Sequence, residues 1–171
     1  FSSEIGKSKL KDFKKAFQQA LRNVFTSVRD LNYTYSGAIP YSTKSSVANV
    51  AAEIKENHKI LHIGALTGYV TSLLSDLCFE VFAIEEEEIH FSILRENIEN
   101  NQIKNVRILN KSLKEGNLIN APYDRIIIDC PITKLNKRLL NQLSNDSGQI
   151  IFIEKNQDNL SKATKIIKNN D

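Results

Sequence analysis

Residues 59–70, KILHIGALTGYV, decide the fold of this chain. The apolar run ends at Gly64, and a second glycine, Gly68, stands just before a new helical pattern. Glycines let a backbone approach a ligand closely, and the first turn of a helix offers unpaired N–H groups. The stretch therefore predicts a strand that enters a cofactor-binding loop. The alternative is a loop that simply turns the chain.

The alternation that starts at residue 59 continues through most of the remaining chain. Strands are predicted at 59–64, 80–85, 105–109, 124–130 and 149–155, and helices at 69–78, 87–101 and 134–143. Apolar strands that alternate with helices are typical of a parallel sheet covered on both faces. The tail 160–171 is ambiguous and is consistent with a sixth strand whose hairpin partner lies beyond the sequence. We therefore expect an α/β fold with a doubly wound, mostly parallel sheet and an incomplete C-terminal hairpin.

The N-terminal third has a different pattern. Apolar residues in the segment 8–30 recur at spacings of three and four, which predicts one or two amphipathic helices. A loop rich in Ser, Thr, Tyr, Gly and Pro then leads to a predicted helix at about 45–56 with a Ser or Thr cap. We expect one domain, in which residues 1–57 form a helical cap and a substrate-side loop and residues 58–171 form a Rossmann-like core.

Composition limits the kinds of partner. The chain has 171 residues, 41% of them hydrophobic, and its 23 basic and 20 acidic residues are interspersed, for a net charge of +3. That pattern is ordinary for a mixed-charge surface, so we expect no nucleic-acid partner. No apolar stretch approaches the roughly 20 residues that span a bilayer, so we expect no membrane partner.

The cysteines and the chain ends suggest a compartment. Cys78 and Cys130 are the only two cysteines, each in an apolar context, which predicts neither a disulfide framework nor a metal site. With no visible signal peptide, the expected localisation is cytoplasmic. The chain begins at Phe1 and contains no methionine, so we expect it to be less than the complete gene product.

Three strand ends carry candidate ligand-binding residues, because ligands of doubly wound sheets bind beyond the carboxyl ends of the strands. Besides the loop from Gly64, these are Glu85, 21 positions later, and Asp129. A carboxylate at the spacing of Glu85 can accept both hydroxyl hydrogens of a ribose. Two alternatives stay open: acids at 85–88 could serve only the helix macrodipole, at about 0.3–1 kcal/mol each, and Asp129 could cap a turn.

The loop residues discriminate between cofactors. A dinucleotide fingerprint that starts at Gly64 needs glycines at positions 66 and 69, which are Leu66 and Tyr69 here. A phosphate-binding P-loop needs a Gly-Lys-Ser/Thr sequence that does not follow. A ligand without a pyrophosphate fits better, and S-adenosyl-L-methionine is the predicted cofactor.

Three stretches together carry a family resemblance: GALTGY at 64–69, APYD at 121–124 and LLNQL at 139–143. With their surroundings, over about residues 36–155, they resemble the protein-L-isoaspartate O-methyltransferase family, in particular its divergent bacterial members. The resemblance implies a class I methyltransferase fold with a seven-stranded sheet whose last two strands form an antiparallel hairpin. It also implies methyl transfer from S-adenosyl-L-methionine to the L-isoaspartyl carboxylate of a protein or peptide, in protein repair.

The resemblance also implies roles for residues. The methionine end of the cofactor would lie over the 64–68 loop, its ribose on Glu85, and its adenine near Ser112 and Leu113. The candidate cofactor-binding residues are His62, Gly64, Ala65, Gly68, Tyr69, Glu85, Glu86, Ser112, Leu113 and Asp129. The family has a serine-centred segment before its first strand, and residues 40–48 can be aligned with it. Ser42 is then the candidate catalytic hydroxyl. The alternative is a serine that caps a helix or is simply solvated.

The implied chemistry needs little from the protein. An isoaspartyl carboxylate, with a pKa near 3.9 for a model side chain, is ionised at neutral pH and needs no general base. The protein has to align the nucleophile with the methyl group and exclude water. Ser42 would then orient the carboxylate rather than become a nucleophile.

Three departures from the family pattern fall in one pocket. His62 replaces an acid, Leu66 replaces the middle glycine, and Ser112 replaces the acid near the adenine. They predict weakened cofactor affinity and motivate one alternative, a catalytically silent binding module. A methyltransferase with another acceptor also stays open, since fold and cofactor do not fix the substrate. For His62 we weigh a neutral packed side chain against a pH-sensitive ligand contact, and we expect His58 and His90 at the surface.

Overall fold

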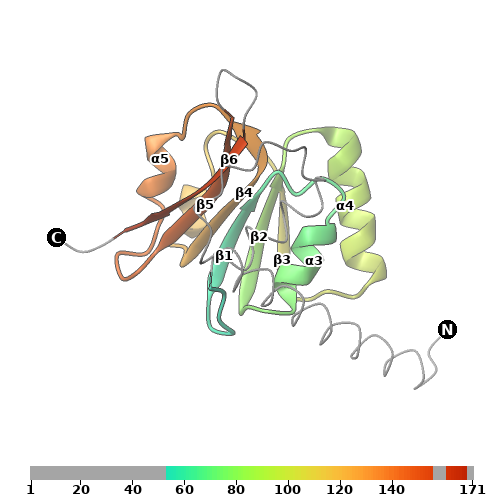
Figure 1. The fold of residues 1–171 in the computed structure, drawn as a ribbon. Coiled ribbons are helices and arrows are strands. Elements are labelled where there is room, and N and C mark those ends of the chain that lie inside the picture. Colours follow the sequence, from blue (N-terminus) through green and yellow to red (C-terminus); the bar gives the residue numbers. More distant parts are fainter. Residues whose placement is uncertain (1–52, 156–160, 169–171) are drawn as a thin grey trace.

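A six-stranded sheet forms the centre of the computed structural model, which describes residues 53–155 and 161–168. Its strands are β1 (Lys59–Ile63), β2 (Glu80–Glu85), β3 (Val106–Asn110), β4 (Arg125–Ile132), β5 (Gln149–Lys155) and β6 (Ser161–Ile167). Their order is β3-β2-β1-β4-β5-β6, and only β6 runs antiparallel to its neighbour (Figure 1). The first three strands extend the sheet to one side of β1, and β4 then starts its extension on the other side of β1. The predicted doubly wound, mostly parallel α/β sheet is therefore confirmed.

The last strand differs in part from the expectation. The predicted sixth strand exists as β6, but its antiparallel neighbour is β5, with Gln149 opposite Ile167 and Lys155 opposite Ser161. Within the two described ranges the sheet has six strands rather than seven. A further strand beyond them stays a prediction.

Helices cover both faces of the sheet. They are α3 (Tyr69–Ser75), α4 (Glu88–Asn100) and α5 (Lys137–Leu140), with the 3-10 turn η1 (Leu118–Asn120). Figure 1 shows α3 and α4 on one side of the sheet and α5 on the other. The prediction of a helix over 134–143 was too long, because the Asn136 side chain accepts the Arg138 N–H and caps the helix there.

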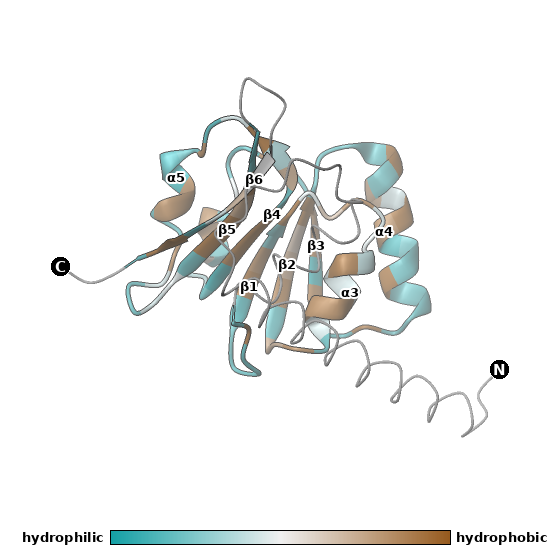
Figure 2. Cartoon of the chain, viewed as in Figure 1, coloured by the Kyte–Doolittle hydropathy of each residue, from teal (hydrophilic) through white to brown (hydrophobic). Residues whose placement is uncertain are grey.

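Alternation along the strands builds two cores. Leu61, Phe82, Ile126 and Ile150 point to the α5 face, whereas Ile60, Val81, Ile127 and Ile151 point to the α3 face. The central strands are therefore apolar on both sides, and Figure 2 shows their hydrophobic colour against more hydrophilic outer helix surfaces. Burial of this kind stabilises the sheet by about 25 cal/mol per Å² of apolar surface.

Several N-terminal expectations lie outside the described residues, including the helices within 8–30, Ser42 and most of the helix at 45–56. Where that helix is described it is not helical: Glu53 has a φ of 49° and turns lead to β1. No helix in the ranges 53–155 and 161–168 is long and apolar enough to cross a membrane.

The expectation that His58 lies at the surface was wrong. His58 is only 7% exposed, and its Nδ1 accepts the Lys55 N–H at 3.1 Å. Burial, followed by the charge of Arg125, lowers the pKa of His58. The neutral ring is thus built into the turn before β1.

This burial predicts a pH dependence of stability. Because the folded pKa lies below the 6.5 of an ordinary histidine, the unfolded chain binds more protons. The contribution of His58 to the free energy of unfolding is fully present above pH 6.5. It decreases as the pH falls, by at most about 1.4 kcal/mol per pH unit. Urea unfolding from pH 8 to pH 5 checks this, with His58→Asn as the control, since an amide oxygen can replace Nδ1 without titrating. Equal pH profiles for the two proteins would contradict it.

Candidate functional site

The loop between β1 and α3 has an unusual backbone. Gly64, Leu66 and Gly68 have φ values of 82°, 50° and 89°, so three of its five residues are left-handed. The N–H groups of Gly64 and Ala65 both donate to the Ile84 carbonyl oxygen, at 3.0 and 3.1 Å. The loop is therefore fixed to the carboxyl end of β2, and Leu66 occupies a conformation that suits glycine.

The two glycines of the loop have different packing roles. A Cβ on Gly68 would lie 2.6 Å from Leu94 Cδ1 of α4, whereas a Cβ on Gly64 would make ordinary 3.5 Å contacts with Cys130. The Asn97 side chain also donates from α4 to the Thr67 carbonyl oxygen at 2.8 Å. Two features therefore favour glycine at position 68, its positive φ and the close approach of α4. The sequence pattern did not indicate the approach of α4.

Glu85 is the polar centre of the site. It is 3% exposed, and its Oε2 accepts the Leu66 N–H at 2.8 Å. Its Oε1 accepts the N–H groups of Glu86 and Glu87, both at 3.1 Å. A single carboxylate therefore joins the β1–α3 loop to the segment that opens α4, which is more than a helix-dipole contact.

These contacts test whether Glu85 suits a nucleoside. A carboxylate offers about four lone-pair positions, of which three are used here. One position therefore remains for a ribose hydroxyl while the loop stays in place. Together with the left-handed loop above β1, this fits a nucleoside ligand, although with one hydroxyl rather than the two expected.

The predicted adenine side of the site is covered by an acid. The exposed Glu86 side chain accepts the Leu113 N–H through Oε2 at 3.0 Å. The neighbouring Ser112 hydroxyl accepts the Lys114 N–H at 3.4 Å. Glu86, itself a predicted cofactor-binding residue, thus occupies the backbone donor of Leu113, which the resemblance places near the adenine. A ligand that uses this donor has to displace Glu86.

His62 lies beneath the loop, on the α3 face of β1. It is completely buried, and its Nδ1 is 2.9 Å from the Thr71 hydroxyl oxygen of α3. Its Nε2 has no hydrogen-bond partner and lies 3.8 Å from Asp129 Oδ2, beyond hydrogen-bond distance. The packed arrangement is the one present, so His62 is placed to support the loop through α3.

Asp129 and Cys130 sit at an irregularity in β4. The register with β5 shifts between Ile128 and Pro131, as a β-bulge does, and a bulge re-aims the side chains at a strand end. Asp129 is buried rather than exposed in a turn, and Cys130 lies where a Cβ on Gly64 would reach it at 3.5 Å. Burial, then the charge of Asp129, raises the pKa of the Cys130 thiol, so it stays protonated at neutral pH.

The structure thus brings together most of the predicted site residues, and their roles stay predictions. Tyr69 is the outlier, since this residue is 58% exposed at the start of α3. Within the described part of the chain, no group of three His, Cys, Asp or Glu side chains could hold a metal ion. The described residues could anchor and orient a ligand.

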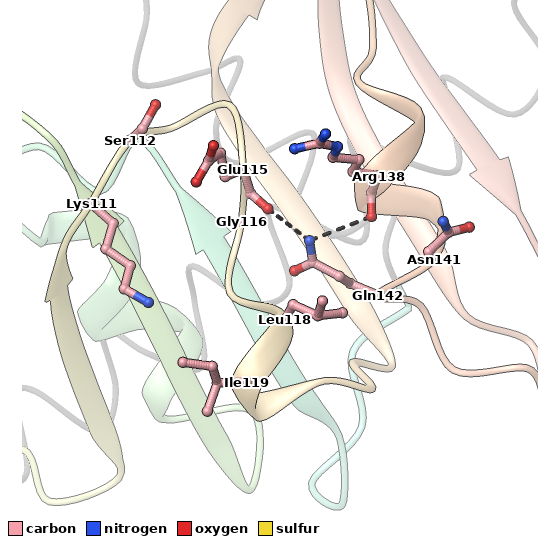
Figure 3. A pocket seen from close by; sticks show the side chains of 9 residues that line it. All are labelled: Lys111, Ser112, Glu115, Gly116, Leu118, Ile119, Arg138, Asn141 and Gln142. Atoms are coloured by element: carbon pink, nitrogen blue, oxygen red, sulfur yellow. Dashed lines mark hydrogen bonds between the residues drawn. The ribbon is translucent and has the colours of Figure 1, made fainter.

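A cavity of about 610 Å³ lies beside this site and was missed in the sequence. It opens between the β3–β4 connection and α5 (Figure 3). Its lining residues are Lys111, Ser112, Glu115, Gly116, Leu118, Ile119, Arg138, Asn141 and Gln142. Ser112 is the only one of these that belonged to the predicted site.

Comparison with known proteins agrees with this geometry. A solved protein-L-isoaspartate O-methyltransferase superposes with a TM-score of 0.73 at 15% identity, over 92% of this chain and 60% of that one. A Streptococcus mutans protein solved in complex with SAH gives a TM-score of 0.51 at 19% identity, over 68% and 73%. The sheet order and the loop above β1 define a class I methyltransferase fold.

The family follows from the sequence match. The family model for protein-L-isoaspartate(D-aspartate) O-methyltransferase matches residues 6–171, and the chain belongs to that family. The Methanosarcina mazei protein-L-isoaspartate O-methyltransferase is 29% identical over 116 residues, which cover 66% of this chain and 48% of the relative. The chain spans about half the length of that curated relative.

Proposed function

We propose that this chain transfers a methyl group from S-adenosyl-L-methionine to L-isoaspartyl carboxylates of proteins or peptides, in protein repair. The family match over residues 6–171 carries the proposal. The position of Glu85 under the loop supports it, because a buried carboxylate with one remaining acceptor position suits a ribose.

The chain's own residues would bind and orient rather than exchange protons. The loop from Gly64 to Gly68 would hold the methionine end of the cofactor, Glu85 its ribose, and Ser112 with Leu113 its adenine. When bound, the cofactor would supply an electrophilic methyl group on sulfur. Ser42 would orient the acceptor carboxylate, which is already ionised at neutral pH.

A binding module without catalysis is the second candidate, and Leu66 favours it. Its left-handed backbone stores strain of about 1–2 kcal/mol in the loop that should hold the cofactor. Calorimetric titration with S-adenosylhomocysteine separates the two candidates. Heat that saturates with one site per chain supports the methyltransferase, whereas no heat at millimolar ligand removes every cofactor-dependent proposal.

Glu86→Ala is expected to tighten S-adenosylhomocysteine binding about three- to five-fold. The substitution frees the Leu113 N–H, and an exposed charged contact of this kind is worth up to about 1 kcal/mol. Calorimetry against Glu88→Ala, which removes an exposed acid from the same helix start, provides the measurement and its control. Weaker binding in Glu86→Ala would show that the acid holds the ligand instead.

Leu66→Gly is expected to raise the affinity for S-adenosylhomocysteine about five-fold. Glycine removes the side chain that would crowd the methionine end of the cofactor, and it adopts a φ of 50° without the cost of about 1–2 kcal/mol that leucine carries. Thr67→Gly is the control, because it loosens the same loop at a residue whose φ is not positive. An unchanged affinity in Leu66→Gly would identify the loop as a structural turn.

A further inference from the structure

The cavity beside the predicted cofactor site has a firmly built floor. The Gln142 side chain is buried, its Oε1 accepts the Asn117 N–H at 2.8 Å, and its Nε2 donates to the Glu115 carbonyl oxygen at 2.8 Å. Gly116 has a φ of 70°, and a Cβ there would lie 2.6 Å from Gln142 Oε1. The loop is thus packed closely on the side chain of Gln142, which lies just after α5.

Two further hydrogen bonds hold the β3–β4 connection, which forms one wall of the cavity. Tyr123 is completely buried, and its hydroxyl donates to the Asn117 carbonyl oxygen at 2.8 Å. The Asn136 side chain, which precedes α5, donates to the Lys114 carbonyl oxygen at 2.7 Å. Both walls are therefore held at a set separation, as in a preformed ligand site, and 610 Å³ lies within the usual range of about 300–1,000 Å³.

The lining combines charge with exposed apolar surface. Lys111 and Arg138 stand on opposite walls of the cavity (Figure 3). The aliphatic side chains of Leu118 and Ile119, on the same loop, are 69% and 85% exposed. Glu115 faces the same space, so the three charged side chains carry a net charge of +1. Two cations beside two open aliphatic side chains suit an anion that carries an apolar group.

We propose that this cavity binds a peptide segment with a carboxylate next to an aliphatic side chain, as part of the protein acceptor. Charge complementarity with Lys111 and Arg138 selects the acidic group, and Leu118 and Ile119 select its apolar neighbour. The identity of the segment as part of an acceptor rests on the proposed function. Ser112 lines the cavity and precedes Leu113 of the predicted cofactor site, so such a segment would lie next to the adenine end of the cofactor.

Two substitutions with opposite expected effects on peptide affinity test the proposal, and neither test needs the cofactor. Fluorescence anisotropy would follow a labelled peptide with two Glu-Leu pairs and no isoaspartyl residue, bound to the full chain. Arg138→Glu is expected to weaken binding at least five-fold, and Glu115→Gln to tighten it about three-fold, since surface charge contacts are worth up to about five-fold each. Lys137→Glu is the matched control, because it makes the same change one residue away, outside the cavity lining.

The possible outcomes distinguish the proposed peptide site from a general charge effect and from contact with a second copy of the chain. Weakening by Arg138→Glu but not by Lys137→Glu, together with tightening by Glu115→Gln, supports the proposal. Equal effects of Arg138→Glu and Lys137→Glu overturn it, as does equal binding of a peptide with Lys-Leu pairs. A change in oligomeric state with Arg138→Glu would assign the cavity to a second copy of the chain and also overturn it. Specific peptide binding without methyl transfer would leave the peptide site standing and would remove both the proposed function and the identity of the segment as part of an acceptor.

Discussion

Glu85→Gln is expected to lower the free energy of unfolding by about 2 kcal/mol and to reduce S-adenosylhomocysteine affinity at least 30-fold. The amide has a single acceptor oxygen, so it cannot serve Leu66 on one side and Glu86 with Glu87 on the other. At least one N–H group then faces an NH₂ group, and an unpaired buried donor costs about 1–3 kcal/mol. A lost charge-assisted bond to the ribose, at about 2 kcal/mol, gives the 30-fold factor.

Urea unfolding and calorimetry measure the two effects on the same preparation. Glu88→Gln is the control, since it makes the same chemical change at an exposed position in the first turn of α4. The control is expected to stay within about 0.5 kcal/mol of the parent protein. If Glu85→Gln unfolds and binds like Glu88→Gln, the carboxylate is not the centre of the site.

Gly68→Ala is expected to destabilise the protein by about 3 kcal/mol. The new Cβ would lie 2.6 Å from Cδ1 of the completely buried Leu94, and the φ of 89° adds backbone strain. Overpacking costs about 1–3 kcal/mol, and a residue forced into a sparsely populated conformation costs about as much. The strain should also move the loop, so S-adenosylhomocysteine binding should decrease.

Gly64→Ala separates the two contributions to that cost. Its φ of 82° is similar, but its Cβ would make only ordinary contacts with Cys130, so about 1 kcal/mol is expected from the backbone alone. Denaturant midpoints of both variants give the comparison. Equal losses for Gly64→Ala and Gly68→Ala would mean that the packing of α4 on the loop contributes nothing.

Strand positions were largely predictable from the sequence. β2 and β5 have the predicted bounds, and β1 ends one residue early, because uninterrupted apolar runs are specific to buried parallel strands. Helix ends were less predictable, since they depend on capping contacts. The C-terminal end of α3 and both ends of α5 show this, and Asn136 is the clearest case.

The candidate site was only half predictable. The position of Glu85 followed from its spacing to the loop, but its bond to the Leu66 N–H joins segments 19 residues apart and depends on a left-handed leucine. His58 was misplaced because it packs against a segment that is distant in the sequence, where its carbonyl oxygen accepts the Phe79 N–H at 3.0 Å. The cavity was missed because no single motif contains both Lys111 and Arg138. Contacts between distant segments carry no local signal.

The most direct test of the central claim is transfer of labelled methyl from S-adenosyl-L-methionine to an isoaspartyl peptide. The proposed function predicts incorporation that base releases, as expected of a methyl ester, and none with the matching aspartyl peptide. Glu85→Gln should lose this activity and Glu88→Gln should keep it. If the parent chain binds S-adenosylhomocysteine but labels both peptides equally or neither, the chain has another acceptor or none, and the proposed function is wrong.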